Sequence, residues 1–201
     1  MKKSLFILAV ASLLSGFISC SDNQERTNQD KLALIPAPQE ITLKNDFFSL
    51  TRRVAITLDS SNPELLKIAH YLNSKTAPAT GFEIPVEKHG NIKFELADDA
   101  TLGAEGYHLL VKHGDVIITA HQPAGIFYGV QTLLQMLPPQ IKSDRKQEGF
   151  DWTIPCADIT DKPQFAWRGL MLDVSRHWFT KEEERELQRH NTAFYRPCPA
   201  E

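Results

Sequence analysis

The sequence predicts an α+β domain, with helices on one face of a mostly antiparallel sheet, followed by the start of an α/β domain. Two amphipathic helical stretches among short β-prone segments predict the first part. A nearly continuous apolar run at residues 167–174, followed by a helix-capping pattern, predicts the second. The length of 201 residues fits this division, because domains typically have about 100–150 residues.

The composition is that of an ordinary globular protein. Lys and Arg total 22 against 25 Asp and Glu, for a formal net charge of −3, and 42% of residues are hydrophobic. This balance excludes a disordered polar chain, a collagen-like repeat and a basic nucleic-acid-binding protein. The seven His are scattered, and neither an HExxH nor a CxxC motif occurs. We therefore expect no metal site, no cofactor and no nucleic-acid partner.

Residues 1–19 have the pattern of a secretory signal peptide. Lys2 and Lys3 precede an apolar segment at 5–18, which is shorter than the about 20 residues of a spanning helix. A small residue before Cys20 resembles a bacterial lipobox, in which the Cys is lipidated and becomes the mature N-terminus. We expect an exported protein, periplasmic or at the cell surface, anchored to a bacterial membrane through this lipid. An ordinary cleaved signal peptide with an incidental Cys is the alternative.

Polar residues 20–33 are predicted to form a tether, and residues 34–150 to form the α+β domain. Alternating or β-prone residues predict strands at 53–58, 84–87 and 92–96, and a hairpin of 106–111 with 116–120. We expect this domain to fold on its own.

Two helices are predicted within the domain. The first begins at Asn62-Pro63-Glu64, which supplies a cap, a proline at the first position and an acid in the first turn. Its apolar face comprises Leu65, Ile68, Ala69 and Leu72. The second begins at Pro123, ends at Pro138-Pro139, and has the apolar stripe Ile126, Val130, Leu133, Leu134 and Leu137. Residues 140–151 are predicted to be a polar linker.

Residues 151–201 are predicted to be a linker and the truncated start of the second domain. The 167–174 run suits a strand buried on both faces, and Thr180 with Glu183 fits a capping box. The following helix does not continue well, because Leu187 is the only large apolar residue from 182 to 190. We therefore expect the chain to stop inside this domain.

Three segments carry a resemblance to a known family: 35–38 (IPAP), 124–135 (AGIFYGVQTLLQ) and 159–177 (ITDKPQFAWRGLMLDVSRH). Together they resemble the exo-β-N-acetylhexosaminidases of glycoside hydrolase family 20, in the style of exported bacterial lipoproteins. The resemblance covers roughly residues 34–183. It implies that the α+β domain precedes a (β/α)₈ barrel that carries the active site, of which this chain holds only the first βα unit.

The resemblance also implies a reaction and a partner. Such enzymes hydrolyse terminal non-reducing N-acetylhexosamine residues from glycans with retention. The sugar's 2-acetamido oxygen attacks the anomeric carbon, an Asp orients the acetamido group, and the adjacent Glu protonates the leaving oxygen. That Asp-Glu pair is expected beyond residue 201. We therefore expect no catalytic residue in this chain, and no activity from the chain alone.

Arg168 is the predicted substrate-binding residue. It resembles an arginine of the first barrel strand that holds the 3- and 4-hydroxyls of the terminal sugar, for which a guanidinium has suitable donors. The alternative is an arginine paired with Asp173 in a structural network. The predicted strand ends near Asp173, Arg176 and His177, on the side where barrels carry their chemistry. The alternative is that these residues form a salt-bridged strand end that supports the next loop.

Other residues receive weaker assignments. Phe127, Tyr128 and Trp152 are expected to pack in the protein rather than stack on a sugar, and the role of Trp178 stays open. Whether Cys156 and Cys198 pair also stays open.

Two other functions remain possible at this point: a non-catalytic, surface-anchored interaction or glycan-binding module, and a decayed gene product. The natural glycan, and the preference for gluco- or galacto-configured sugars, are not indicated.

Overall fold

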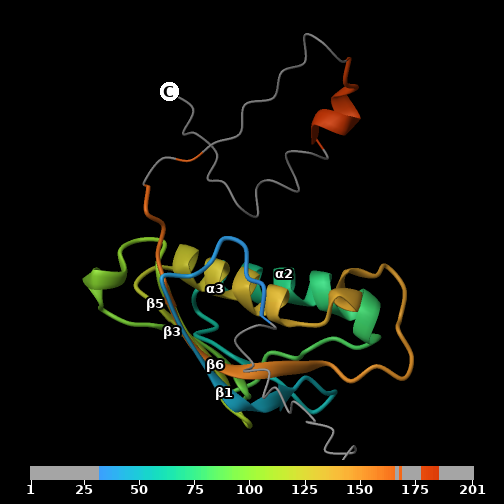
Figure 1. The fold of residues 1–201 in the computed structure, drawn as a ribbon, viewed down its shortest axis with the longest axis horizontal. Helices are drawn as coiled ribbons and strands as arrows, with labels where there is room; N and C mark the ends of the chain where they lie inside the picture. Colours follow the sequence, from blue (N-terminus) through green and yellow to red (C-terminus); the bar gives the residue numbers. More distant parts are fainter. Residues whose placement is uncertain (1–31, 166–167, 169–177, 186–201) are drawn as a thin grey trace, which may run out of the picture. The chain divides into compact units, whose positions relative to one another are not determined.

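The computed structural model describes residues 32–165, 168 and 178–185. Within them, six strands form one sheet in the order β1-β6-β4-β5-β3-β2, and two helices, α2 and α3, lie on the same face of it (Figure 1). The elements are β1 (Glu40–Ser49), β2 (Ile56–Thr57), α2 (Pro63–Thr80), β3 (Ile92–Leu96), β4 (Tyr107–Val111), β5 (Val116–Ala120), α3 (Pro123–Met136) and β6 (Thr153–Asp161). Short 3₁₀ turns are η3 (Ala100–Leu102) and η4 (Pro139–Lys142).

The predicted hairpin and the strand before it are confirmed. β4 and β5 pair antiparallel from Tyr107 opposite Ala120 to Val111 opposite Val116, and β3 has the predicted bounds. The other two predicted strands are mostly absent. The 53–58 segment contributes only β2, and the 84–87 segment makes an isolated bridge between Val86 and Ile56.

The sheet is mixed rather than mostly antiparallel, which corrects the prediction. The pairs β1–β6, β6–β4 and β4–β5 are antiparallel, but β5–β3 and β3–β2 are parallel. The β2–β3 pair is parallel because α2 carries the chain back along the sheet between the two strands, as parallel neighbours require.

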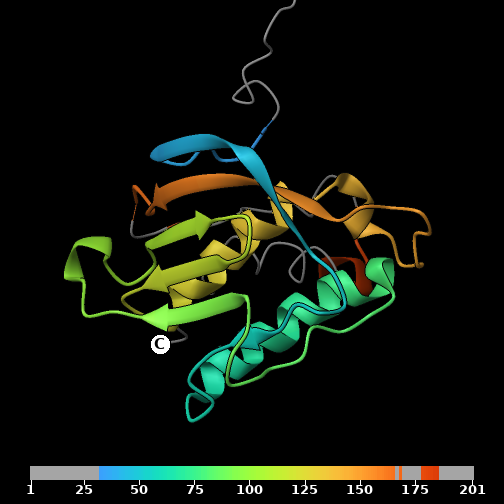
Figure 2. The ribbon, with the colours of Figure 1, turned by 90° about the horizontal axis from the view of Figure 1, so that it is seen from below.

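β6 extends the domain beyond residue 150, its predicted end. This strand lies between β1 and β4 (Figure 2), with Glu40 opposite Thr160 and Tyr107 opposite Asp161. Proline normally argues against an interior strand, since it cannot donate a ladder hydrogen bond. Pro155 is tolerated because it lies beside the register shift in β1 and beyond Ala157, the last residue that pairs with β4.

The predicted polar linker at 140–151 is packed against the domain. Ile141 of η4 is buried, and the backbone N–H of Gln147 donates to the carbonyl of Ala79 at the end of α2, at 2.8 Å. The segment therefore leads from α3 back to the sheet as part of the fold.

The predicted start of α2 is confirmed in detail. Asn62 Oδ1 accepts hydrogen bonds from the N–H groups of Glu64 and Leu65, at 3.0 and 3.3 Å. The helix ends at Gly81, whose φ of 73° is the left-handed conformation that glycine adopts at little cost. All four residues of the predicted apolar face are buried: Leu65, Ile68, Ala69 and Leu72.

α3 lies directly on the central strands (Figure 2) because the 124–135 motif places glycines on its inner face. A Cβ atom on Gly129 would lie 2.4 Å from Cγ2 of Ile118 in β5. Ile126 and Val130 fill the rest of that face and are fully buried. The motif is therefore explained first by helix–sheet packing.

The start of the (β/α)₈ barrel is not confirmed, because its predicted strand lies outside the described residues except at Arg168. The capping box after it is present. Glu183 Oε2 accepts from the N–H of Thr180 at 2.7 Å, and Thr180 Oγ1 accepts from the N–H of Glu183 at 3.3 Å. Among the described residues, no helix combines the length and apolarity needed to cross a membrane.

Candidate functional site

Arg168 reaches back onto the α+β domain. Its Nη2 lies 2.8 Å from Oε2 of Glu105 and 3.3 Å from the Oη of Tyr128, while Nη1 donates to the carbonyl of Phe165 at 2.6 Å. These contacts join the segment after β6 to two separate parts of the domain. We name Glu105, Tyr128 and Arg168 the anchor cluster.

The fold positions both acceptors firmly. Glu105 stands in the turn between η3 and β4, which is closed by a hydrogen bond from the N–H of Gly106 to the carbonyl of Leu102 at 3.1 Å. Tyr128 projects from α3, whose backbone is held against the sheet by Gly129. Both acceptors therefore belong to well-packed elements.

The charges in the anchor cluster are shielded from solvent. The side chains of Arg168 and Glu105 are 22% and 13% exposed. Burial alone would lower the pKa of the Arg168 guanidinium, but its hydrogen bonds to Glu105 and Tyr128 and the charge of Glu105 raise the pKa above its ordinary value. Arg168 is thus a permanent cation with a nearly buried carboxylate as its partner.

Aromatic rings support the cluster from the side of α3. The Cζ atom of Arg168 lies 5.8 Å from the ring centroid of Tyr128, within the range of a cation–π contact. Tyr128 meets the edge of Phe127, and Phe127 packs against Tyr71 with centroids 5.2 Å apart. Phe127 and Tyr128 are therefore packing residues, as expected, and Tyr128 also accepts a hydrogen bond.

Most other predicted site residues lie outside the described residues: Cys20, Asp173, Arg176, His177 and Cys198. The pairing of Arg168 with Asp173 is accordingly not tested. Cys156 is a buried free thiol, Trp152 is buried, and Trp178 is almost fully exposed.

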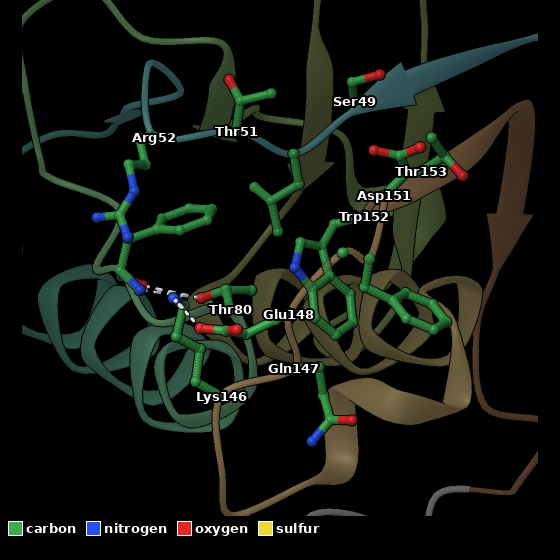
Figure 3. A pocket seen from close by; sticks show the side chains of 14 residues that line it. Ser49, Thr51, Arg52, Thr80, Lys146, Gln147, Glu148, Asp151, Trp152 and Thr153 are labelled. Carbon is green, nitrogen blue, oxygen red and sulfur yellow. Dashed lines mark hydrogen bonds and ion pairs between the residues drawn. The ribbon is translucent and has the colours of Figure 1, made fainter.

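A second feature is a cavity of about 660 Å³ at the end of α2, between the loop after β1 and the residues leading into β6 (Figure 3). Phe82, Phe150 and Trp152 line it, and the rings of Phe150 and Trp152 have centroids 5.3 Å apart. No sequence pattern predicts this cavity, because its lining comes from three separate segments, one of which was predicted to be a linker.

Charged side chains surround the aromatic part of this cavity. Arg52 stacks over the ring of Phe82 at 5.3 Å and donates to the carbonyl of Gly81 at 3.0 Å. Lys146 pairs with Glu148 at 3.2 Å (Figure 3). Rings beside hydrogen-bonding groups suit a polar organic ligand such as a sugar.

The cavity is lined by the carboxyl groups of Glu148 and Asp151, whereas the anchor cluster combines one carboxyl group with a guanidinium and a phenol. Across the described parts of the chain, no three His, Cys, Asp or Glu side chains gather as metal ligands. The anchor cluster pairs a cation with acceptors and holds no nucleophile with an adjacent base, so its chemistry is that of holding one segment against another.

Comparison with known proteins identifies the family. The sequence profile described as "Glycosyl hydrolase family 20, domain 2" matches residues 31–162. The chain belongs to glycoside hydrolase family 20. The matched segment ends one residue after β6, in agreement with the extent of the sheet.

Relatives of this family 20 chain include two bacterial enzymes. It is 33% identical over 192 residues to a beta-hexosaminidase of Porphyromonas gingivalis, covering 91% of this chain and 24% of that protein. It is 30% identical over 162 residues to a beta-N-acetylhexosaminidase of Cellulomonas fimi, covering 78% of this chain and 31% of that protein. The chain thus spans about a quarter to a third of these relatives.

Solved structures of the family share the fold. The N-acetyl-beta-hexosaminidase of Streptomyces plicatus, in complex with Thio-NAglucal, aligns with a TM-score of 0.71 and 39% identity, over 81% of this chain and 32% of that one. The beta-N-acetylhexosaminidase of Bacteroides fragilis aligns with a TM-score of 0.64 at 22% identity, which bears on the fold alone.

Proposed function

We propose that this chain is the front part of a β-N-acetylhexosaminidase. The complete enzyme removes terminal non-reducing N-acetylhexosamine residues from glycans, with retention of configuration and participation of the substrate's 2-acetamido group. The observation that supports this most is the 39% identity to the Streptomyces plicatus enzyme, whose complex holds Thio-NAglucal.

The anchor cluster supports the same proposal. β6, the last strand of the matched domain, contains the first residues of the 159–177 segment. Later in that segment, Arg168 contacts the domain through Glu105. We propose that the later residues of this segment, Asp173, Arg176 and His177, support the end of the predicted strand. We also propose that Arg168 contacts the 3- and 4-hydroxyls of the terminal sugar in the complete enzyme, as the resemblance implies.

The proposal is tested by a chimera in which residues 32–183 replace the matching part of the Streptomyces plicatus enzyme. The folded chimera should hydrolyse a chromogenic N-acetyl-β-glucosaminide and release the β-anomer first, as NMR can detect. A chimera that unfolds cooperatively but does not turn over would contradict the proposal.

Residues 20–201 alone should give the same rate as the blank, because the proposed Asp-Glu pair lies outside them. Turnover clearly above the blank that survives Arg168→Ala would show that this chain contains a catalytic centre of its own.

A second candidate function, a glycan-binding module, is favoured by the cavity beside Phe150 and Trp152. If it binds glycans, titration of residues 20–201 with N-acetylglucosamine oligomers should release heat, and Phe150→Ala should abolish the signal. Phe165→Ala is the matched control, because Phe165 is exposed and does not line this cavity. Equal signals in both variants would remove the cavity as the binding site.

We also propose export and lipid anchoring through Cys20, supported by the signal-like pattern of residues 1–20. Cells expressing the chain with radiolabelled palmitate should label the wild type and leave Cys20→Ala unlabelled. Labelling of both would place the lipid elsewhere, and labelling of neither would leave an ordinary signal peptide.

A further inference from the structure

We propose that the cavity beside Trp152 is a second, non-catalytic site that binds uncharged N-acetylated saccharides, with the indole N–H of Trp152 donating to the acetamido carbonyl. Unlike the glycan-binding module considered above, this site accompanies the proposed hydrolysis. The class of saccharide rests on the proposed function, because the substrate proposed there carries acetamido groups. The unpartnered N–H and the cavity around it belong to the described residues and do not depend on that assignment.

The indole N–H of Trp152 is a hydrogen-bond donor without a protein acceptor. Trp152 is only 6% exposed, and no group in the described part of the chain accepts from its Nε1 atom. The atom is open to the cavity, because Gln131 Nε2 is the one described side-chain N or O atom that is both inaccessible and unpaired. Figure 3 shows the indole nitrogen on the edge of the ring that faces Arg52 and Thr80. A buried tryptophan usually pairs its N–H, so this donor indicates a ligand that carries an acceptor.

An amide carbonyl suits this donor better than a hydroxyl group does. A carbonyl oxygen only accepts, whereas a hydroxyl also carries a proton that needs an acceptor of its own. The methyl group of an acetamido substituent is apolar, and the rings of Phe150 and Trp152, with centroids 5.3 Å apart, offer it an apolar contact. An acetamido group thus satisfies both the donor and the rings beside it.

The charges around the cavity favour an uncharged ligand. Two cations line it, Arg52 and Lys146, together with two carboxylates, Glu148 and Asp151. An anion or a cation would therefore meet a like charge as well as an opposite one. Lys146 already pairs with Glu148 at 3.2 Å. The Asp151 carboxylate has no side-chain partner within the described residues, so it is available to accept hydrogen bonds from sugar hydroxyls.

The cavity is formed by well-fixed backbone. The N–H of Leu50 donates to the carbonyl of Trp152, and the N–H of Gln147 donates to the carbonyl of Ala79, both at 2.8 Å. The volume of about 660 Å³ lies within the range of about 300–1,000 Å³ that small-molecule sites occupy. Phe150 is 39% exposed and can pack against the C–H face of a pyranose. A site fixed in this way loses little conformational freedom when it binds.

The site is tested by ¹H–¹⁵N NMR of residues 20–201, in which each indole N–H gives a signal of its own. The chain has three tryptophans, and Trp152→Phe identifies the signal of Trp152. Titration with tri-N-acetylchitotriose should move this indole proton signal downfield, because its N–H gains an acceptor. Cellotriose has the same linkage with hydroxyls in place of the acetamido groups, and it should leave the signal nearly unchanged.

Two further variants change exposed side chains of the cavity and should leave the fold intact. Phe150→Ala removes the packing ring and should raise the Kd for tri-N-acetylchitotriose about three- to tenfold. Asp151→Asn weakens the acceptor for sugar hydroxyls and should raise the Kd by a smaller factor. Phe165→Ala and Asp144→Asn are the matched controls, because both residues are exposed and neither lines the cavity.

Three results would overturn the proposal. They are a Trp152 signal that does not move at about 10 mM tri-N-acetylchitotriose, an equal shift with cellotriose, and equal affinity in Phe150→Ala and Phe165→Ala. A selective shift that weakens in the two cavity variants alone supports it. Because this experiment measures no hydrolysis, its failure leaves the chimera test of the proposed function standing. A chimera that does not turn over likewise leaves the NMR result unchanged.

Discussion

A Cβ atom on Gly125 would lie 2.2 Å from the carbonyl oxygen of Gly106, so α3 touches the turn before β4 backbone to backbone. The same Cβ would also meet the Cβ of Ala120, at 2.7 Å. The first turn of the helix thus has no space for any side chain at this position.

Gly125→Ala should therefore destabilise the domain. Overpacking in a well-packed interior costs about 1–3 kcal/mol, and the clash with a carbonyl oxygen favours the upper end. Urea unfolding of residues 32–162 would measure the loss of unfolding free energy. Gly114→Ala is the control, because a Cβ there meets no atom within 4 Å. Equal stability of the two variants would mean that α3 is free to move away from the turn.

The extent of the sheet makes a second prediction. A polypeptide of residues 32–162 should fold cooperatively, whereas residues 32–150 should not, because β6 is then missing from between β1 and β4. Loss of β6 leaves β1 without a strand to pair with and exposes the side of β4. Circular dichroism with thermal unfolding distinguishes the two, and a cooperative transition in the shorter polypeptide would show that β6 is dispensable.

The N-cap of α2 makes a third prediction. Asn62→Ala should lower the free energy of unfolding by about 1 kcal/mol, because the N–H groups of Glu64 and Leu65 lose their acceptor. Asn62→Asp retains a capping oxygen and should stay within a few tenths of a kcal/mol of the wild type. If both variants lose the same stability, a feature of Asn62 other than capping is responsible.

The buried Tyr107 predicts a loss of stability at alkaline pH. Burial raises the pKa of Tyr107 to about 12, although its hydrogen bond with Thr132 opposes the change. A tyrosine in the unfolded chain has a pKa of about 10, so the unfolded state loses this proton first. The contribution of Tyr107 is therefore complete below pH 10 and is lost as the pH rises to about 12.

Tyr107→Phe should lack this part of the pH dependence. Two pKa units correspond to about 2–3 kcal/mol. Between pH 10 and about 12, the wild type should therefore lose about that much more unfolding free energy than the variant. At neutral pH the variant should be less stable by about 1 kcal/mol, because the hydroxyl of Thr132 loses its partner. Chemical unfolding at several pH values measures both effects, and parallel pH curves would contradict the assignment.

Local signals in the sequence were sufficient for the elements that depend on nearby residues. The cap at Asn62, the apolar faces of both helices and the β4–β5 hairpin are set by side chains a few positions apart, and the structure has them as predicted. The Thr180–Glu183 capping box was found for the same reason.

The elements that were missed depend on distant partners. β1 has the charged residues Lys44 and Asp46 in its middle, and it is ordered by pairing with β6, more than a hundred residues later. Pro155 is unusual in an interior strand, and it is tolerated in β6 because it lies beside the β1 irregularity and beyond the residues that pair with β4. A short apolar segment such as 84–87 looked like a strand, yet it makes just one bridge.

Prediction of the candidate site was also limited by contacts between residues far apart in sequence. Arg168 was found from its motif, but nothing local identifies Glu105, which is 63 residues away, as its partner. The alternative pairing with Asp173 lies outside the described residues, and the carboxyl group that lies beside Arg168 is that of Glu105.

The pairing of β1 with β6 also determines how the domain responds to a mechanical load. The start of β1 lies beside the end of β6, and Gln39 bonds to both Asp161 and Lys162, at 3.2 and 3.0 Å. The chain therefore enters β1 and leaves β6 at the same end of these two paired strands. A force that pulls the start of β1 away from the end of β6 would act parallel to the hydrogen bonds between the two strands. It would break these hydrogen bonds one at a time, beginning at Glu40. The domain should thus unzip under tension rather than resist it by shear.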